Sequence, residues 1–401
     1  MVIEKQPRSL QEFGNKVMIS AGEASGDLHG ARLVTAMLER RPDLVFAGLG
    51  GTELAAAGVD VLFDAKKIAV VGLAEVLSHL SDILAARKIL KKWLVDQRPA
   101  LLIVIDFPDF NFILARQAKK LGIPVLYYIS PQVWAWRPGR VKTMKKLVNS
   151  IGVILPFEEQ FFRDRGVNAR YVGHPLLDSV RCTMDRDSFC ADHDIDPDSV
   201  LVGLMPGSRK KELEKLLPTL VQTAAELQRD REEKMVFLLP VASTVSVDEV
   251  MKNGLDEYGE GLDIRLITEN RYDMMAACDA AAVVSGTVTL ELALLDTPMV
   301  VFYKVSPATY RVGRMLISKD LTCFSLVNLI AGATIVEELL QDEVNPQRLA
   351  AALSDVLFDG EKREAVRQGL RLVRERMGEP GASAKAAELA LSLLGSEKKS
   401  D

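Results

Sequence analysis

Short apolar runs separated by amphipathic stretches dominate the first half of the chain. One run, Leu101 to Ile105, is apolar throughout, as in a strand that is buried on both faces of a sheet. A helical pattern from Asn111 to Leu121 follows, and a second apolar run covers Val125 to Ile129. Strand, helix and strand in this order form a βαβ unit with parallel strands. The full pattern predicts strands at 17–21, 44–49, 60–63, 101–106, 124–129, 151–155 and 170–173.

The same alternation returns in the second half and then gives way to helices. Further strands are predicted at 200–205, 235–239, 262–267, 280–284 and 299–303, and helices at 346–357, 361–377 and 382–394. The segment between the halves is acidic with few apolar residues, which is typical of a linker. We therefore predict an α/β fold with two Rossmann-like, doubly wound parallel-sheet domains facing a cleft. The predicted divisions are domain 1–175, linker 176–199, domain 200–344 and helical extension 345–401.

Composition and charge narrow the function classes. The 401 residues are 48% hydrophobic and 26% charged, which is ordinary for a soluble globular protein, and the net charge of −5 gives no basic field for nucleic acid. The four cysteines and four histidines form no cluster, so we expect no structural metal and a reducing, cytosolic environment. No stretch approaches the roughly 18 apolar residues of a membrane-spanning helix. The N-terminus lacks the apolar region of a signal peptide.

The chemistry of the first half is concentrated after two of its strands. Pro108 cannot continue a strand, so Asp106 lies at the carboxyl end of the 101–105 run, where open α/β sheets bind ligands. A purely structural alternative is that Asp106 and Asp109 cap the next helix. The following strand ends in a segment that contains Trp134 and Trp136.

A glycine-rich turn follows the first strand. Gly22, Gly26 and Gly30 would let the backbone turn tightly and approach a ligand, and a helix from Ala31 to Arg40 is expected after them. Their spacing is not G-x-G-x-x-G, so a dinucleotide fingerprint is not supported.

Two turns of the second half are suited to an anion. Pro206 to Arg209 leads from a strand directly into a helix, whose free N–H groups and positive dipole favour a phosphate; the alternative is a plain helix cap with a solvated arginine. Ser285, Gly286 and Thr287 repeat this design, and Glu291 one turn later could accept hydrogen bonds from ribose hydroxyls. The chain has no P-loop motif, and no Asp-x-Asp stands at a strand end to bind a metal with a diphosphate. We therefore expect nucleotide-diphosphate chemistry without a metal or other cofactor.

An apolar stripe precedes the 101–105 strand. Its members recur at helical spacing and four cations follow them, a pattern that fits either a core-facing helix or a helix offered to anionic lipid. The apolar residues are Val76, Leu77, Leu80, Ile83 and Leu84, and the cations are Arg87, Lys88, Lys91 and Lys92.

These motifs together resemble one family across most of the chain. The blocks AGEASGDLHGA, IAVVGLAEVL, IDFPDFN, YISPQVWAWRPGRV, ILPFE, VGHPL, MPGSR, SGTVTLE, PMVVFYK and SLVNLIAG are similar, in the same order, to those of lipid-A-disaccharide synthases. These are bacterial glycosyltransferases of the two-domain B fold. Any one block is a weak signal, whereas so many in order are highly specific.

The resemblance implies an activity and a location. The family transfers 2,3-diacylglucosamine from UDP to the 6-hydroxyl of 2,3-diacylglucosamine 1-phosphate, which gives a β-1,6-linked disaccharide with inversion and releases UDP. The expected partners are these two lipids and the inner face of the inner membrane, on which the protein would lie peripherally. The family also implies that the C-terminal helices cross back to the N-terminal domain or to a partner chain, so a homodimer is considered.

The resemblance also implies residue roles. By the resemblance, Asp106 is the expected catalytic carboxylate and Arg209 the expected diphosphate contact. We expect Asp106 to act as the general base, with His29 and then His174 as alternatives, and Arg209 to stabilise the leaving UDP. Val76, Leu77, Leu80, Ile83 and Leu84 are expected at the membrane or the acyl chains. The expected substrate-binding residues are Gly22, Gly26, Asp109, Asn111, Trp134, Trp136, Gly207, Ser208, Ser285, Gly286, Thr287, Glu291 (ribose) and Asn328 (near the nucleotide).

Two other classes remain at this point. A UDP-N-acetylglucosamine 2-epimerase would share the two-domain fold but would need no stripe facing lipid. A non-enzymatic nucleotide-sugar-binding protein would have no reason to place Asp106 at a cleft.

Overall fold

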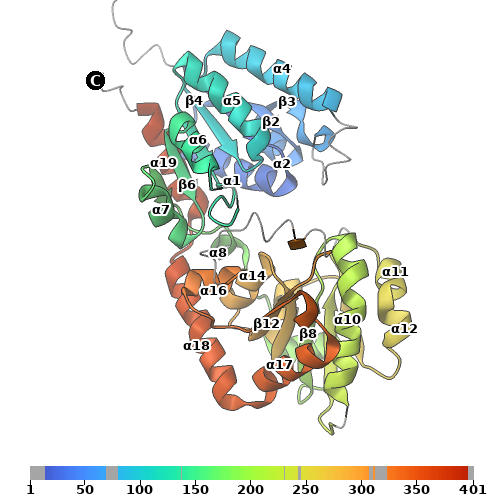
Figure 1. The fold of residues 1–401 in the computed structure, drawn as a ribbon. Coiled ribbons are helices and arrows are strands. Elements are labelled where there is room, and N and C mark those ends of the chain that lie inside the picture. Colours follow the sequence, from blue (N-terminus) through green and yellow to red (C-terminus); the bar gives the residue numbers. More distant parts are fainter. Residues whose placement is uncertain are drawn as a thin grey trace, which may run out of the picture. The chain divides into compact units, whose positions relative to one another are not determined.

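The chain folds as two compact units, each built on a parallel sheet. The computed structural model describes residues 14–68, 80–136, 138–229, 231–242, 245–306, 310–311 and 323–395. Unit 1 comprises residues 1–178 together with 379–401, and unit 2 comprises residues 179–378. In each unit helices cover both faces of the sheet (Figure 1), so the predicted α/β class with two doubly wound domains is confirmed.

Unit 1 contains a seven-stranded sheet in the order β3-β2-β1-β4-β5-β6-β7. Its strands are β1 (Lys16–Ala21), β2 (Val45–Gly50), β3 (Asp60–Asp64), β4 (Leu101–Ile105), β5 (Val125–Tyr128), β6 (Ser150–Val153) and β7 (Ala169–Tyr171). Its helices are α1 (Ala24–Arg40), α2 (Thr52–Ala56), α4 (Leu80–Gln97), α5 (Pro108–Leu121), α6 (Arg140–Leu147), α7 (Pro156–Arg163) and α19 (Ala382–Gly395), and α8 (Leu176–Ser179) lies at the unit boundary.

Unit 2 contains a six-stranded sheet in the order β10-β9-β8-β11-β12-β13. Its strands are β8 (Val200–Met205), β9 (Met235–Pro240), β10 (Ile264–Ile267), β11 (Ala280–Val284), β12 (Met299–Tyr303) and β13 (Glu338–Leu340). Its helices are α9 (Arg186–Asp192), α10 (Lys210–Gln228), α11 (Val247–Val250), α12 (Asp256–Tyr258), α13 (Arg271–Ala277), α14 (Val288–Leu294), α16 (Leu326–Ala331), α17 (Pro346–Phe358) and α18 (Gly360–Met377).

Both sheets reverse their direction of winding at one place, which positions the candidate chemistry. The chain builds outward from β1 to β3 and then resumes beside β1 with β4, and it does the same from β8 to β10 and then with β11. Such a switch point is where open α/β sheets bind ligands, beyond the carboxyl ends of the strands. Ala21 pairs with Ile105, so Gly22 and Asp106 leave neighbouring strands at the same level.

Burial explains why the central strands form where the apolar runs predict them. All five side chains of β4 are fully buried, as expected for a strand covered by helices on both faces. Helix α5 then buries one face, which includes Phe110 and Leu114, and ends at Gly122, whose φ of 74° lies in the left-handed region that glycine adopts freely.

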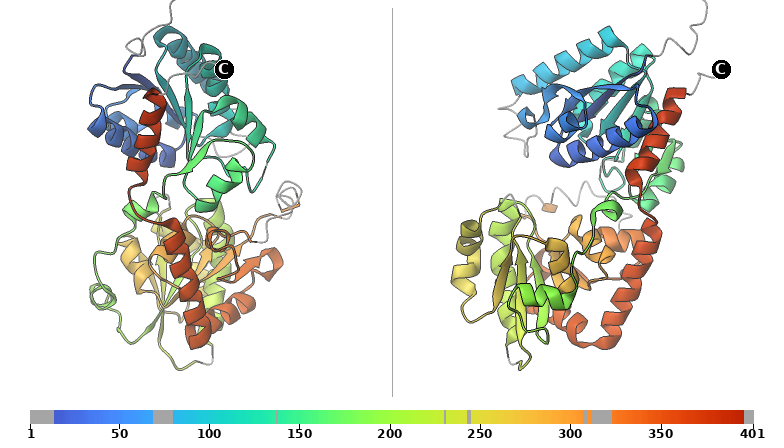
Figure 2. Two further views of the ribbon diagram at one scale, coloured as in Figure 1. Left: turned by 90° about the vertical axis from the view of Figure 1, so that its left-hand side faces the viewer. Right: turned by 180° about the vertical axis from the view of Figure 1, so that it is seen from behind.

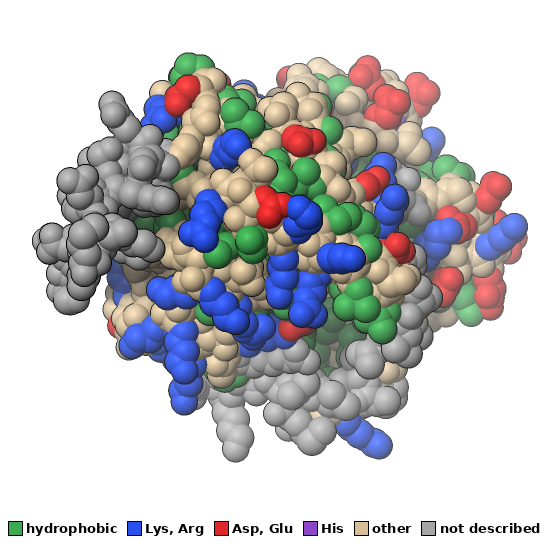
Figure 3. All heavy atoms as spheres, turned by 90° about the horizontal axis from the view of Figure 1, so that it is seen from above, with side chains coloured by type: hydrophobic (Ala, Val, Ile, Leu, Met, Phe, Trp, Pro, Cys, Tyr) green, Lys and Arg blue, Asp and Glu red, His purple; other side chains and the backbone are tan. Residues whose placement is uncertain are grey.

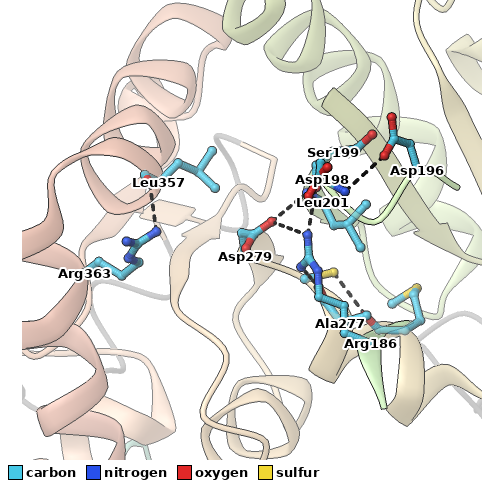
Figure 4. Close-up of polar contacts among 11 residues, drawn as sticks. Arg186, Asp196, Asp198, Ser199, Leu201, Ala277, Asp279, Leu357 and Arg363 are labelled. Atoms are coloured by element: carbon cyan, nitrogen blue, oxygen red, sulfur yellow. Dashed lines mark hydrogen bonds and ion pairs between the residues drawn. The ribbon is translucent and has the colours of Figure 1, made fainter. Parts of the chain in front are cut away.

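The predicted linker 176–199 is wrong for most of its length. Residues 179–199 belong to unit 2, where helix α9 buries Phe189 completely. Arg186 donates to the Ser199 carbonyl at 2.8 Å and to the Asp279 carboxylate at 3.2 Å, and the same carboxylate accepts from the Leu201 N–H at 2.8 Å (Figure 4). The acidic composition suggested a linker, but the buried Phe189 and the hydrogen bonds of Arg186 and Asp279 attach this segment to unit 2.

The C-terminal helices divide between the two units. Helices α17 and α18 belong to unit 2, and α17 packs on α10, so the expectation that all of 345–401 packs on the N-terminal domain is too broad. Only the part beyond residue 378 belongs to unit 1, where α19 lies against α1 (Figure 2). Ala386, Ala387 and Ala390 are buried in the same apolar cluster as Leu33 and Val34 of α1.

Helix α1 begins earlier than predicted. It starts at Ala24 rather than Ala31, so the glycine-rich segment is its first turns and not a loop. Within these turns the Asp27 side chain accepts hydrogen bonds from the backbone N–H groups of Gly51 at 2.6 Å and Glu53 at 2.9 Å, and it thereby caps α2 from a neighbouring helix.

Candidate functional site

The end of β4 has a strained backbone. Asp106 and Phe107 have φ values of 42° and 45°, and Ile129 after β5 has a φ of 57°. Residues with side chains rarely adopt this left-handed region, and they do so mainly where the surrounding structure imposes it. The Asp106 N–H donates to the Ile129 carbonyl at 3.2 Å, so the two strained strand ends support each other.

Two side chains fix the Asp106 backbone. Its carbonyl accepts from the Tyr127 hydroxyl and from the Asn111 amide, each at 2.7 Å. Asn111 is fully buried, and its amide oxygen accepts from the Ser20 hydroxyl at 2.7 Å. The Asn111 side chain is therefore used within the protein, where it positions Asp106. Tyr127 was missed in the sequence because it lies inside an apolar run, where a tyrosine is typical of core.

The Asp106 carboxyl is a stronger base than an ordinary aspartate. Burial, with a smaller contribution from the negative charge of Glu23, raises its pKa to about 6. Burial lowers the pKa of His29 to about 4, and it does the same for His174. The His174 Nδ1 already accepts from the Leu176 N–H at 3.2 Å. Of these three groups, Asp106 has the pKa closest to neutrality.

The remaining predicted residues of unit 1 differ in their surroundings. A Cβ on Gly22 would lie 2.3 Å from the Phe107 ring, so this glycine allows the strand ends to pack together. A Cβ on Gly26 would make only ordinary contacts, at 3.5 Å. Asp109 is exposed and forms an ion pair with Arg140.

The two predicted tryptophans are placed differently. The Trp134 indole is buried and donates to the Glu158 carboxylate at 3.0 Å, which ties the segment after β5 to helix α7. The Trp136 side chain is 47% exposed. Of the two predicted tryptophans, Trp136 is therefore the more exposed.

In unit 2 the turn after β8 lies next to the carboxylate of Glu212. Gly207 has a φ of 108°, and a Cβ there would lie 2.3 Å from the Glu212 carboxylate. Arg209 begins α10 as its N-cap residue and donates to that carboxylate at 2.8 Å while its side chain stays 73% exposed. Ser208 lies between them in the turn. The guanidinium predicted to meet a diphosphate is thus at the surface of the switch point.

The turn after β11 lies beside it, because β11 pairs with β8. Gly286 has open space where a Cβ would be, Thr287 is exposed, and the Ser285 hydroxyl donates to the Phe324 carbonyl at 3.4 Å. Glu291 is 7% exposed and accepts from Arg271 at 2.9 Å and from the Tyr272 hydroxyl at 3.3 Å. Arg271 and Tyr272 did not stand out in the sequence.

Asn328 has an internal role in the structure. It is fully buried and donates to the Val336 carbonyl at 3.0 Å and to Glu338 at 2.7 Å. Glu338 also accepts from the Phe324 N–H at 2.9 Å, and the Phe324 carbonyl accepts from Ser285. Asn328 therefore supports the segment that holds the Ser285 turn.

The apolar stripe divides between core and surface. Val76 and Leu77 lie outside the described residues. Ile83 packs against the unit 1 core, whereas Leu80 and Leu84 of α4 are 46% and 50% exposed. The core face of α4 consists of Ala86, Leu90 and Leu94.

A cationic groove lies beside this exposed apolar edge. It has a volume of about 570 Å³ between α4, α5 and the end of α6. Figure 3 looks down on this side of the protein, where Lys and Arg side chains gather. Partial burial lowers the pKa of Lys91, and the neighbouring charges of Arg87 and Lys120 lower it further. The cations that line the groove are Arg87, Lys91, Arg116, Lys119 and Lys120.

Neither a bilayer-spanning helix nor a cluster of metal ligands is present in the described part of the chain. Its helices include none with both the length and the apolar character needed to cross a bilayer. The same residues contain no cluster of three or more His, Cys, Asp or Glu side chains arranged to hold a metal ion.

Solved structures with the same fold include nucleotide-sugar enzymes. UDP-GlcNAc 2-epimerase from Neisseria meningitidis superposes with a TM-score of 0.59 at 13% identity, covering 94% of this chain and 99% of that protein. MurG from Acinetobacter baumannii gives a TM-score of 0.58 at 14% identity, with coverage of 94% and 99%. At such low identity these similarities establish the two-domain fold alone.

Sequence comparison goes further. The sequence profile of the family described as lipid-A-disaccharide synthetase matches residues 17–392. The lipid-A-disaccharide synthase of Syntrophus aciditrophicus is 49% identical over 385 residues, which are 96% of this chain and 98% of the relative. That of Geobacter sulfurreducens is 46% identical over 387 residues, which are 96% and 99%. The chain therefore belongs to the lipid-A-disaccharide synthetase family.

Proposed function

We propose that this protein transfers 2,3-diacylglucosamine from UDP-2,3-diacylglucosamine to the 6-hydroxyl of 2,3-diacylglucosamine 1-phosphate. The observation that carries this proposal is the division of chemistry between the two switch points. Unit 1 offers a partly buried carboxyl with a raised pKa, and unit 2 offers a cation and an acidic ribose partner beside an open glycine turn. The family to which the chain belongs consists of glycosyltransferases of lipid A biosynthesis. Such an enzyme needs a base for the acceptor hydroxyl and groups that hold the nucleotide diphosphate of the donor.

Asp106 acts as the general base. As the acceptor oxygen forms its bond to the sugar C1, its proton passes to the Asp106 carboxylate, and the bond between C1 and the UDP oxygen breaks with its electron pair going to UDP. Attack from the face opposite UDP inverts C1 and gives the β linkage. A base with a pKa of about 6 is ionised at neutral pH and still holds a proton more strongly than an ordinary aspartate. His29, with a pKa of about 4, would be the weaker base.

Unit 2 holds the donor. Arg209 stabilises the charge that grows on the diphosphate as its bond to C1 breaks, so its largest contribution comes in the transition state. The Ser285–Gly286–Thr287 turn leaves room for the diphosphate, since Gly286 has open space on its Cβ side. Glu291 accepts from the ribose hydroxyls.

The protein lies peripherally on the inner face of the inner membrane. Both substrates carry acyl chains, and a protein with a net charge of −5 needs a local attraction to approach an anionic surface. The exposed edge formed by Leu80 and Leu84, together with the cationic groove, supplies apolar contact and positive charge on the same side of unit 1. This arrangement supports a docking face for lipid headgroups.

A single assay tests the proposed reaction. Purified protein is incubated with UDP-2,3-diacylglucosamine, with and without the acceptor, and UDP and the disaccharide are quantified. The transfer reaction yields both products in equal amounts only when the acceptor is present. Isomerised donor without acceptor would indicate an epimerase, and unchanged donor under both conditions would indicate a binding protein. Repeating the assay in EDTA tests the expectation, drawn from the sequence, that no metal is needed; a loss restored by added metal would contradict it.

A further inference from the structure

Three side chains form a compact polar cluster at the unit 2 switch point. The Arg271 Nη2 donates to the Tyr272 hydroxyl at 2.8 Å and to Glu291 Oε1 at 2.9 Å, and the Tyr272 hydroxyl lies 3.3 Å from the same oxygen. The guanidinium carbon lies 4.7 Å from the centre of the Tyr272 ring. The cluster connects the first turn of α13 to the first turn of α14.

Arg271 and Tyr272 donate to only one of the two oxygens of the Glu291 carboxylate. Within the described residues, the hydrogen bonds made by the Glu291 side chain all reach Oε1. These bonds leave the acceptor positions of Oε2 unused. Burial raises the Glu291 pKa, while the positive charge of Arg271 and the hydrogen bond from Tyr272 oppose that rise. A hydroxyl donates more strongly to an ionised carboxylate than to a neutral acid.

The start of α13 is fixed from its opposite side as well. Asp273 accepts from the Thr183 N–H at 2.6 Å and from the Met184 N–H at 3.0 Å. The Met275 carbonyl accepts from the Thr297 hydroxyl at 2.8 Å. Since these bonds hold the helix independently of Arg271, the bond between Arg271 and Glu291 is not required to anchor α13.

We propose that Arg271 and Tyr272 are positioning residues for the nucleotide, which hold Glu291 in the orientation that receives the ribose diol. The inference rests on the proposed donor site in unit 2 and extends it to two residues with no role assigned so far. Arg271 acts on the ribose through Glu291, so its effect depends on the ribose hydroxyls. A residue that merely connected two helices would affect every nucleotide equally.

The test compares UDP with 2′,3′-dideoxy-UDP, which lacks the diol, by calorimetric titration of the full-length protein. Wild type should bind UDP more tightly than the dideoxy analogue. Arg271→Met should weaken UDP binding about tenfold, the size of one hydrogen bond to a charged group, and change dideoxy-UDP binding by less than about twofold. Arg271→Lys keeps the charge and should recover part of the loss. The matched control is Arg265→Met, which breaks the Arg265–Asp263 pair elsewhere in unit 2.

A second variant covers the case in which Arg271→Met fails to fold. Tyr272→Phe keeps the ring and removes only the hydroxyl, and should weaken UDP binding about threefold with dideoxy-UDP unaffected. Equal losses for both nucleotides in either variant would overturn the inference, since the residues would then be structural. So would unchanged UDP binding in both. If wild type binds neither nucleotide, the proposed donor site itself fails and the inference fails with it.

Discussion

The two units share one strand order around their switch points, but the residues at those points differ in backbone conformation and in ion pairing. In unit 1 residues with side chains take left-handed backbone conformations, and the Asp106 carboxyl has no ion-pair partner among the described residues. In unit 2 glycine takes the left-handed position of the first turn, and both charged groups have partners, Arg209 with Glu212 and Glu291 with Arg271.

This difference corresponds to two kinds of chemistry. A group that must gain and lose a proton near neutrality needs a raised pKa, which burial without a counter-ion provides. A site that binds a diphosphate needs fixed charges and close backbone approach, which ion pairs and glycine turns provide. The same topology therefore serves proton transfer in one unit and anion binding in the other.

The largest expected effect tests the unit 1 side of this comparison. Asp106→Asn keeps the shape of the side chain and removes the base, so turnover should fall by roughly 10²–10⁴-fold in the UDP-release assay. In wild type, kcat/KM should decline as the pH falls below about 6, because Asp106 then becomes protonated.

The control for that variant is an aspartate of unit 1 outside the proposed site. Asp43→Asn makes the same chemical change at an exposed carboxylate of unit 1 that already has Arg41 as a partner, and its activity should stay within about threefold of wild type. Full activity of folded Asp106→Asn would assign the base to another group, with His29 examined first.

The next effect tests the unit 2 side. Arg209→Ala should lower kcat about a hundredfold, at the lower end of the cost of removing one preorganised donor, and weaken UDP binding by much less. Lys211→Ala removes a neighbouring exposed cation and serves as the charge-matched control. Equal losses in kcat and in UDP affinity would show that Arg209 binds substrate and transition state alike.

A smaller effect concerns the exposed edge of α4, which has no counterpart assigned in unit 2. Replacing both Leu80 and Leu84 by serine should reduce binding to anionic vesicles roughly thirtyfold. Each side chain is about half exposed, and burying its remaining apolar surface in the membrane would contribute about 1 kcal/mol to binding. The melting temperature should change little. Leu90→Ser, at a fully buried position of the same helix, should instead unfold the domain. A collapsed melting temperature for the Leu80 and Leu84 variant would place these residues in the core.

The cationic groove should contribute less per residue. Lys119→Gln with Lys120→Gln should weaken vesicle binding about tenfold, because a cation near an anionic surface is worth up to about 1 kcal/mol, and the effect should shrink in high salt. Arg229→Gln with Lys234→Gln removes the same charge from exposed positions in unit 2 and should leave binding unchanged. Equal losses of vesicle binding in the two double variants would show that net charge, and not the position of the groove, controls binding.

The sequence predicted the sheets well because buried parallel strands are written as continuous apolar runs. The predicted strand at 101–106 corresponds to β4, and Pro108 marks its end. Asp106 could be found because its position depends only on local sequence and on the topology rule for open sheets. The start of α1 could not, because the glycines in its first turns locally favour a loop.

The hydrogen-bond partners of the candidate residues could not be predicted from the sequence either. Tyr127 and Arg271 reach their targets across 21 and 20 residues, and no local pattern encodes those contacts. Asn328 shows the converse, since its motif gave it a place near the nucleotide while the structure uses its side chain to hold Glu338 and Val336. The cationic groove combines residues from α4 and α5 that are separate in the chain.

The smallest expected effect measures the energetic cost of the unpaired acid. Because the folded-state pKa of Asp106 is about 6 and the ordinary value is 3.8, ionised Asp106 destabilises the fold above pH 6, and this penalty disappears as the pH falls below about 4. Asp106→Asn should therefore be more stable than wild type by about 1–2 kcal/mol at pH 8, a value reduced from the full linkage because the group keeps partial contact with water. The two proteins should converge at pH 4. Thermal unfolding at pH 8, 6 and 4 measures this difference, with Asp109→Asn as the control that should show no gain. A constant difference at all three pH values would mean that packing, rather than the charge, distinguishes the variant, and the contrast between the two switch points would then lose its electrostatic basis.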